Sequence, residues 1–143
     1  MLILLFTLVQ LSTVTIEEVV ADFHELKTKE SEVKFINKFE TSLKPSTLAY
    51  VIAIKMKQVD YTFNPLAKLK IFKTNKNHLN NLIDENPNNL HLRYIRLLLQ
   101  ENTPSFLGYK NYLEEDKLFL KQEMILGEDY NYLFFYILKN TSL

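Results

Sequence analysis

Glycine and proline are scarce in this chain, and their scarcity is the feature that most limits its fold. Only two glycines and four prolines occur among 143 residues. Tight β-turns favour glycine, so a sandwich or barrel of many strands would need more of them. The prolines instead separate long stretches whose apolar residues recur at helical spacing. The chain is therefore predicted to be all-α, with long helices and few connections.

Helix starts are marked by side chains that accept hydrogen bonds from the free N–H groups of a first helical turn. The strongest signal is Asn64 followed by Pro65, because proline suits the first helical position. The other predicted caps are Thr15 (in a capping box with Glu18), Ser46, Asn89 and Ser105. These signals predict core helices over residues 46–59, 64–84, 90–100 and 106–126. The first of them is apolar around most of its axis and is expected to be central.

The remaining elements are shorter, and the type of the last one is open. One helix is predicted after Thr15, and another has an apolar face made of Val33, Phe35, Ile36, Phe39 and Leu43. Gly127 is expected to end the helix 106–126 in a left-handed conformation. Residues 128–139 are largely apolar and fit either a final helix or a buried strand. About seven helices are expected, packed as an antiparallel bundle in a single domain over residues 15–143.

The break between two core helices resembles part of a tetratricopeptide (TPR) repeat. The sequence DENPNN at residues 84–89 separates two helices as the end of a B helix does in such repeats. These repeats recur at about 34 residues, with small residues at fixed packing positions. No second copy lies in register here, and the chain has only four alanines. A TPR-like helical hairpin is therefore predicted, and an array of repeats is not.

Residues 63–120 also resemble a family of small exported helical proteins of Bacteroidetes-type bacteria, whose activity is uncharacterised. The shared features are Asn64-Pro65, the Asn-Pro break, the two arginines Arg93 and Arg96, and the sequence PSFLGY at residues 104–109. The resemblance covers less than half of the chain. It implies a helical fold and export, and it implies no particular activity.

Residues 2–11 are apolar except for Thr7 and Gln10, and two interpretations fit them. The run is too short to span a bilayer as a helix, but it has the length of the apolar region of a signal peptide. No Lys or Arg precedes it, and no A-x-A cleavage site follows it. Residues 1–14 are expected to be a signal peptide of a periplasmic or secreted protein. The alternative is a buried N-terminal apolar helix or strand of a cytoplasmic one.

The charge pattern disfavours several classes of partner. Lys and Arg number 17, and Asp and Glu also number 17, so no net field draws the chain to nucleic acid or to an anionic membrane. The absence of cysteine excludes disulfides and thiolate-bound metals. Most lysines between residues 55 and 78 are expected on a solvated face, and only Lys68 is expected to run its stem along the core. No nucleic acid, cofactor or transmembrane span is expected.

Catalytic motifs are absent from the sequence. His24, His78 and His91 fall on different predicted helices, and none has a second ligand at metal-binding spacing. Solvated or core positions are the simpler interpretation of all three. No G-x-S-x-G sequence occurs, and two glycines cannot form a glycine-rich phosphate loop.

The only two arginines, Arg93 and Arg96, are predicted to be partly buried. With Gln100 they form a narrow polar stripe on a helix that is otherwise largely apolar. A buried cation needs a partner, and the planar fork of arginine matches a carboxylate. On the next helix Asp116 intrudes into an apolar face, so it is expected to meet Arg93 or Arg96 and to set the packing of the two helices. The alternative is an anion-binding site, with Lys68 as a further candidate member.

Three kinds of function remain open. The favoured hypothesis is a non-catalytic helical module that has an interaction or structural role with a protein partner. The alternative is a protein that binds a small molecule or lipid in a pocket lined by its eight tyrosines and ten phenylalanines. The third is an enzyme without a recognisable motif. An apolar cavity of roughly a few hundred Å³ would distinguish the ligand-binding protein.

If residues 2–11 are a signal sequence, we expect the mature protein in its host to begin near Thr15. N-terminal sequencing of protein purified from that host tests this prediction. An intact Met1 on protein recovered from the cytosolic fraction would refute export.

Overall fold

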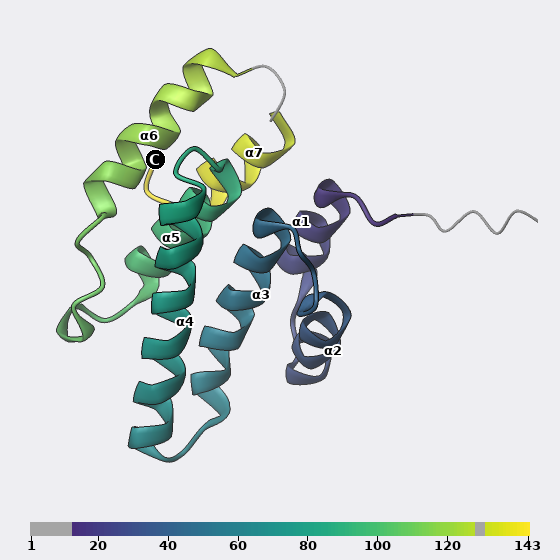
Figure 1. The fold of residues 1–143 in the computed structure, drawn as a ribbon, viewed down its shortest axis with the longest axis vertical. Helices are drawn as coiled ribbons and strands as arrows, with labels where there is room; N and C mark the ends of the chain where they lie inside the picture. Colours follow the sequence, from purple (N-terminus) through teal and green to yellow (C-terminus); the bar gives the residue numbers. More distant parts are fainter. Residues whose placement is uncertain (1–12, 128–130) are drawn as a thin grey trace, which may run out of the picture.

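The computed structural model describes residues 13–127 and 131–143, and these residues are largely helical (Figure 1). They form seven α-helices and two short 3-10 turns, and no β-strand occurs among them. The helices are α1 (Ile16–Glu25), α2 (Lys29–Phe39), α3 (Pro45–Lys57), α4 (Pro65–Glu85), α5 (Leu90–Asn102), α6 (Leu113–Leu126) and α7 (Asn131–Asn140). The 3-10 turns are η1 (Gln58–Tyr61) and η2 (Ser105–Leu107). The all-α prediction is confirmed, and the open last element is a helix.

Helix α3 lies at the centre, as its apolar sequence predicts. It packs against α1, α2, α4 and α5. Eight of its 13 residues are buried, including all of residues 49–54. One neighbour covers only one stripe of a helix, so a helix that is apolar on all sides needs several neighbours. Helix α4 runs back beside α3, and η1 lies in the connection between them (Figure 1).

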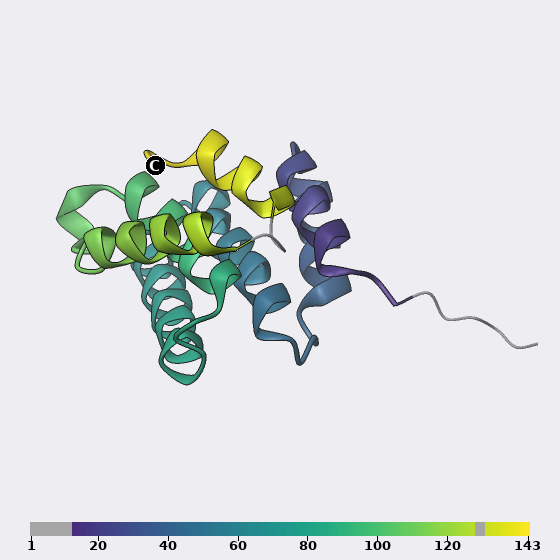
Figure 2. The same ribbon diagram turned by 90° about the horizontal axis from the view of Figure 1, so that it is seen from above.

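The later helices pack outward from α3, and the last of them contacts the first helix. Helix α5 packs on α3 and α4, and α6 packs on α5. Helix α7 then returns to contact α1 (Figure 2). Its side chains Leu133 and Ile137 are fully buried, so α7 belongs to the core rather than to a loose tail.

Three predicted caps act as expected, and two of them begin α4 and α1. The side-chain oxygen of Asn64 accepts from the backbone N–H of Leu66 at 2.9 Å, with Pro65 in the first turn of α4. Thr15 and Glu18 form the reciprocal capping box at the start of α1. Such caps satisfy donors that have no partner within the helix, so local sequence is enough to place these two helix starts.

Ser46 is not the cap of α3, and this part of the prediction is wrong. Helix α3 begins one residue earlier, at Pro45, because the fixed φ of proline already suits the first turn. The hydroxyl of Ser46 instead accepts from the side-chain amide of Asn89 at 2.9 Å. Asn89 also caps α5 as predicted, accepting from the backbone N–H of Leu92 at 3.1 Å. One asparagine therefore links the start of α5 to the start of α3.

The predicted helix 106–126 is too long at its N-terminal end. Ser105 begins the short turn η2, which Gly108 ends with a left-handed φ of 64°. Residues from this turn up to Tyr112 form a loop, and α6 begins only at Leu113. The error has a simple cause, because a glycine in the left-handed conformation interrupts an apolar pattern that otherwise suits a helix.

Gly127 ends α6 as predicted, but its conformation is extended rather than left-handed, with φ of −102°. A Cβ atom at this position would lie 2.9 Å from the backbone oxygen of Glu123. The glycine is therefore needed for a close backbone approach and not for a positive φ.

The described residues contain no helix that is long and apolar enough to cross a membrane. The predicted signal peptide or apolar helix at residues 1–14 falls almost wholly on residues 1–12, which lie outside the described residues. Export therefore stays a prediction.

Candidate functional site

Asp116 of α6 is fully buried and lies against both arginines of α5. Arg96 binds it in a bidentate manner, with Nε donating to Oδ2 at 2.7 Å and Nη2 donating to Oδ1 at 2.8 Å. Nε of Arg93 lies 2.7 Å from Asp116 Oδ1. The prediction that Asp116 meets Arg93 or Arg96 is confirmed, and it meets both.

Gln100 completes the contact between α5 and α6. Its side-chain amide donates to Asp116 Oδ2 at 2.9 Å, and its side-chain oxygen accepts from the backbone N–H of Tyr112 at 2.9 Å. Tyr112 is the N-cap residue of α6 and has no side-chain cap of its own. Gln100 therefore satisfies a backbone group at the start of α6 while it holds the buried carboxylate.

The arginine cluster is balanced in charge and covered on both sides. Glu115 supplies a second carboxylate, whose Oε1 lies 2.9 Å from Arg93 Nη2, so two cations face two anions. The guanidinium of Arg93 lies over the ring of Phe119, and that of Arg96 lies over the ring of Tyr112. Burial alone would lower the pKa of Arg96, but its hydrogen-bonded carboxylate partner raises it. This geometry favours a structural role over binding of an external anion.

Two residues lie elsewhere than the sequence predicted. Lys68 is exposed on α4 and takes no part in the ion pairs of the cluster, so its expected position along the core is wrong. Phe106 was expected within a helix, but it lies in η2 and is 85% exposed. Both errors follow from extending a helical pattern to residues whose neighbours in space were unknown.

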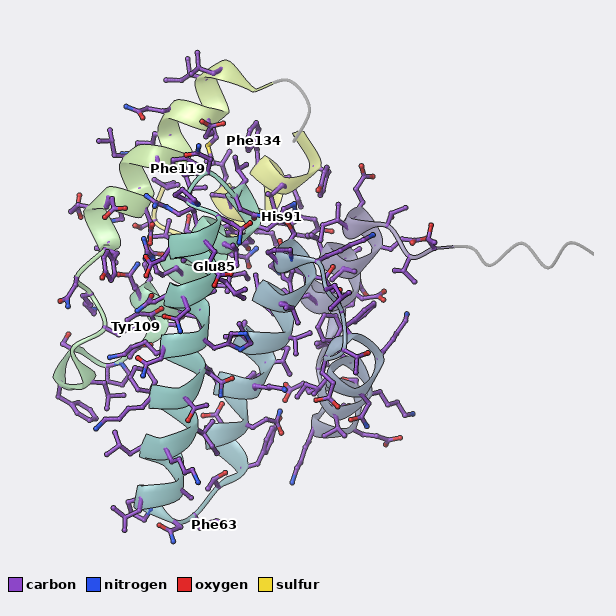
Figure 3. The ribbon with its side chains drawn as sticks, in the orientation of Figure 1. Phe63, Glu85, His91, Tyr109, Phe119 and Phe134 are labelled. Carbon is purple, nitrogen blue, oxygen red and sulfur yellow. The ribbon has the colours of Figure 1, made fainter. Side chains whose placement is uncertain are left out.

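His91 joins α5 to α3 and α7 through tyrosine hydroxyls. Its Nδ1 lies 2.7 Å from the hydroxyl of Tyr50, and its Nε2 lies 3.3 Å from the hydroxyl of Tyr132. His91 is 4% exposed and lies where these three helices meet (Figure 3). A buried imidazole whose two nitrogens face hydroxyls is satisfied without a charge.

His24 holds α7 against α1 in a similar way. Its Nε2 lies 3.1 Å from the hydroxyl of Tyr94, and its ring stacks on that of Tyr136 with 4.4 Å between the centroids. Burial, together with the charge of Lys139, lowers the pKa of His24 to about 4. Burial also lowers the pKa of His91 to about 4. Both histidines are therefore neutral near pH 7 and are weak bases.

The third histidine and the acidic residues add no metal site. His78 is exposed on α4. Within residues 13–127 and 131–143, no group of three or more His, Cys, Asp or Glu side chains could hold a metal ion. The interpretation of the histidines as core or solvated residues agrees with this arrangement.

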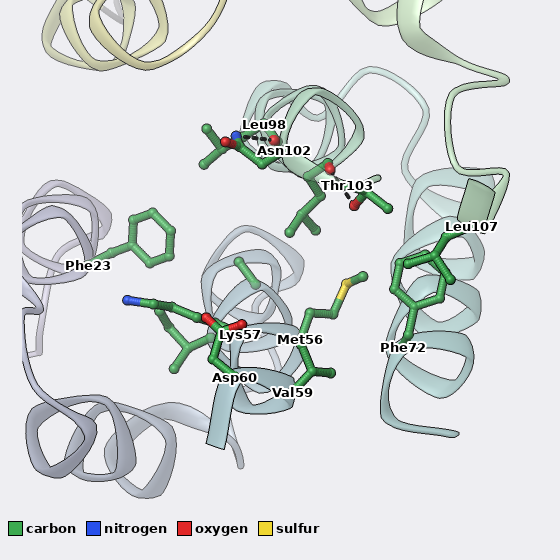
Figure 4. A pocket seen from close by; sticks show the side chains of 13 residues that line it. Phe23, Met56, Lys57, Val59, Asp60, Phe72, Leu98, Asn102, Thr103 and Leu107 are labelled. Atoms are coloured by element: carbon green, nitrogen blue, oxygen red, sulfur yellow. Dashed lines mark hydrogen bonds between the residues drawn. The ribbon is translucent and has the colours of Figure 1, made fainter. Parts of the chain in front are cut away.

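A pocket of about 430 Å³ opens between α1, α3, α4 and α5, and we call it the α3 pocket (Figure 4). Its apolar lining includes Phe23 of α1, Ala53 and Met56 of α3, Phe72 of α4, and Leu98 and Leu99 of α5. Four polar residues complete it, namely Lys57, Asp60, Asn102 and Thr103. The sequence predicted helices here but gave no indication that they leave this space.

Lys57 connects the rim of the α3 pocket to a buried carboxylate. Its ammonium group lies 2.6 Å from Oε1 of Glu32, which is fully buried on α2. Gln58 donates to the other oxygen of Glu32 at 3.1 Å. The hydrogen bond to Glu32 raises the pKa of Lys57. Glu32 thus fixes α2 to the end of α3 much as Asp116 fixes α6 to α5.

Glu32 was missed by the sequence prediction, although a signal for it exists. It lies three residues before Phe35 and seven before Phe39, so it shares their helical face. The predicted face used Val33 and Leu43 instead, and both are exposed in the structure, at 39% and 95%. A lone acid on an apolar face, which pointed to Asp116, would also have pointed to Glu32.

Comparisons with protein-family models, with characterised proteins and with solved structures found no match to this chain. The site must therefore be chosen on its own geometry. The arginine cluster is closed and balanced, and the histidines are satisfied by tyrosines. The α3 pocket has an apolar wall and a polar rim, and its volume leaves room for another molecule.

Asp116→Ala is expected to lower the free energy of unfolding by about 3 kcal/mol or more, because it leaves buried arginines without their carboxylate. Glu115→Ala is the matched control, since Glu115 is 56% exposed and its loss should cost about 1 kcal/mol or less. Urea unfolding followed by circular dichroism measures both. Equal small losses for the two variants would contradict a structural role and would revive the anion-binding alternative.

The lowered pKa of the buried His91 predicts that the protein loses stability in mild acid. The pKa of His91 is about 4 in the folded protein, below the ordinary 6.5, so the unfolded chain takes up a proton first as the pH falls. The stability that neutral His91 contributes is fully present above pH 6.5 and is lost as the pH falls toward 4. Between pH 7 and pH 5 the titration of His91 is expected to lower the free energy of unfolding by about 2 kcal/mol.

His91→Gln is expected to reduce this pH dependence while lowering stability at pH 7, because glutamine does not titrate. The readout is the difference in unfolding free energy between pH 7 and pH 5 for each protein. His78→Gln is the control and should keep the original slope, because His78 is exposed. Parallel pH profiles for the His91→Gln variant and the unaltered protein would rule out this assignment.

Proposed function

We propose that this protein is a non-catalytic binding module that takes a small apolar ligand in the α3 pocket. The observation that carries the proposal is the volume of about 430 Å³ between α1, α3, α4 and α5, with its mainly apolar lining. Ligand pockets in proteins commonly have volumes of about 300–1,000 Å³ and mainly apolar walls with a few polar groups. The α3 pocket has both properties.

The lining supports occupation by an apolar group. Ala53, Met56 and Phe72 are at most 8% exposed, so the deeper part of the lining offers little contact with water. Ala53 is one of only four alanines in the chain, and its small side chain leaves space over α3. Unfilled apolar space loses dispersion contacts on its lining, and a bound apolar group would restore them.

A protein partner is the second candidate, and exposed apolar side chains on the last two helices favour it. They are Leu118, Ile125 and Leu126 on α6, and Phe135 and Leu138 on α7. Large exposed apolar side chains are candidates for contact with another protein. The TPR-like hairpin of α4 and α5 would suit such a role, because stacked helical hairpins present extended surfaces to partners.

Export to the periplasm or the cell surface is proposed as well. It rests on the apolar run at residues 2–11 and on the resemblance of residues 63–120 to exported proteins. A location in the cytoplasm is the alternative. The ligand proposal is independent of this choice, because the residues that line the α3 pocket all lie between Phe23 and Leu107.

The ligand proposal is tested with N-phenyl-1-naphthylamine, a neutral probe whose fluorescence rises in apolar surroundings. We expect saturable binding with one probe per chain. Ala53→Leu should weaken it about tenfold or more, because the larger side chain enters the space that a pocket of this size offers. Ala67→Leu is the matched control, since Ala67 does not line the pocket. An equal effect of both variants, or no saturable binding, would sink the proposal.

A further inference from the structure

We infer that the α3 pocket selects small amphiphiles that carry one ammonium group on an apolar body, and that Asp60 is the selecting residue. The inference rests on the proposed binding of a small apolar ligand. Beyond that proposal, it specifies that the ligand carries a positive charge and donates hydrogen bonds. The polar rim carries the argument, because the apolar lining does not distinguish one aliphatic molecule from another.

The single cation among the lining residues already has a partner. Lys57 Nζ lies 2.6 Å from Glu32, a carboxylate with no exposed surface. Separating the two would leave a buried charge without compensation, which is costly. Figure 4 shows the Lys57 ammonium extending away from Met56 and Phe72. Lys57 is therefore not free to bind an anionic ligand.

Asp60 lies at the same rim without an ion pair of its own, and the lysine whose charge it faces, Lys57, is bound to Glu32. It lines the α3 pocket and is exposed, and no ion pair joins it to a lysine or arginine within the described residues. Two carboxylates, Glu32 and Asp60, thus share one lysine, Lys57. Because Lys57 is held by Glu32, the exposed carboxylate of Asp60 favours a cation at the rim over an anion.

The neutral polar residues of the rim offer acceptors to such a group. The side-chain amide of Asn102 donates one of its two N–H groups to the backbone oxygen of Leu98 at 2.7 Å and keeps its side-chain oxygen as an acceptor. The hydroxyl of Thr103 donates to the backbone oxygen of Leu99 at 2.6 Å, which leaves its lone pairs as acceptors. Both bonds are visible in Figure 4. An ammonium group offers three donors and no acceptor, which matches this rim.

The test compares three ligands with the same eight-carbon chain, namely octylammonium, octanol and octanoate, each displacing the neutral fluorescent probe. We expect octylammonium to bind about fivefold more tightly than octanol, the upper end for a solvent-exposed ion pair, and octanoate to bind most weakly. The preference should shrink at high salt, because Asp60 is exposed.

Asp60→Asn should abolish the preference for octylammonium and leave the affinity for octanol unchanged. Asp84→Asn is the matched control, because it makes the same change of net charge at an exposed residue outside the pocket. If octanol binds and octanoate binds as tightly as octylammonium, the inferred selectivity is wrong while the proposed pocket stands. If the probe binds and none of the three ligands displaces it, the inference fails while the pocket stands. If the probe itself does not bind saturably, the proposed function and the inference both fail.

Discussion

The burial of most of α3 is the constraint on which the rest of this structure depends. Its side chains are apolar around most of the axis, so the helix must be covered on several sides by other parts of the chain. Helices α1, α2, α4 and α5 provide this cover. Their side chains do not fill the whole space around the C-terminal half of α3, and the α3 pocket lies there. The candidate site is thus a consequence of covering one apolar helix with several short ones.

Two buried carboxylates determine how the outer helices attach to this centre. Asp116 on α6 is held by Arg93 and Arg96, and Glu32 on α2 is held by Lys57. A buried charge has to find its partner at a defined distance, whereas apolar side chains tolerate sliding. Each acid therefore specifies one position of its helix. The difference between them is that the arginine cluster is closed, while Lys57 lies at the rim of the α3 pocket.

The rim and the lining of the α3 pocket have separate origins. The apolar lining comes largely from residues of α3 and of the helices that cover it, and the polar rim comes from the end of α3, from η1 and from the end of α5. Helix ends carry free carbonyl groups, and Thr103 uses its only donor on one of them. A rim that presents acceptors follows from this local chemistry, and it gives an otherwise unselective apolar space a preference for donors.

The sequence by itself determined the helices and some of their ends. Scarce glycine, the caps Asn64 and Asn89, and apolar residues at helical spacing are local signals, because a helix satisfies its own backbone. One long-range contact, that of Asp116 with the arginines, was also predictable, since a buried charge requires an opposite one. The pairing of Lys57 with Glu32, the tyrosine partners of the histidines and the α3 pocket were decided only by the tertiary structure. They depend on distances between helices, which no local pattern of side chains contains.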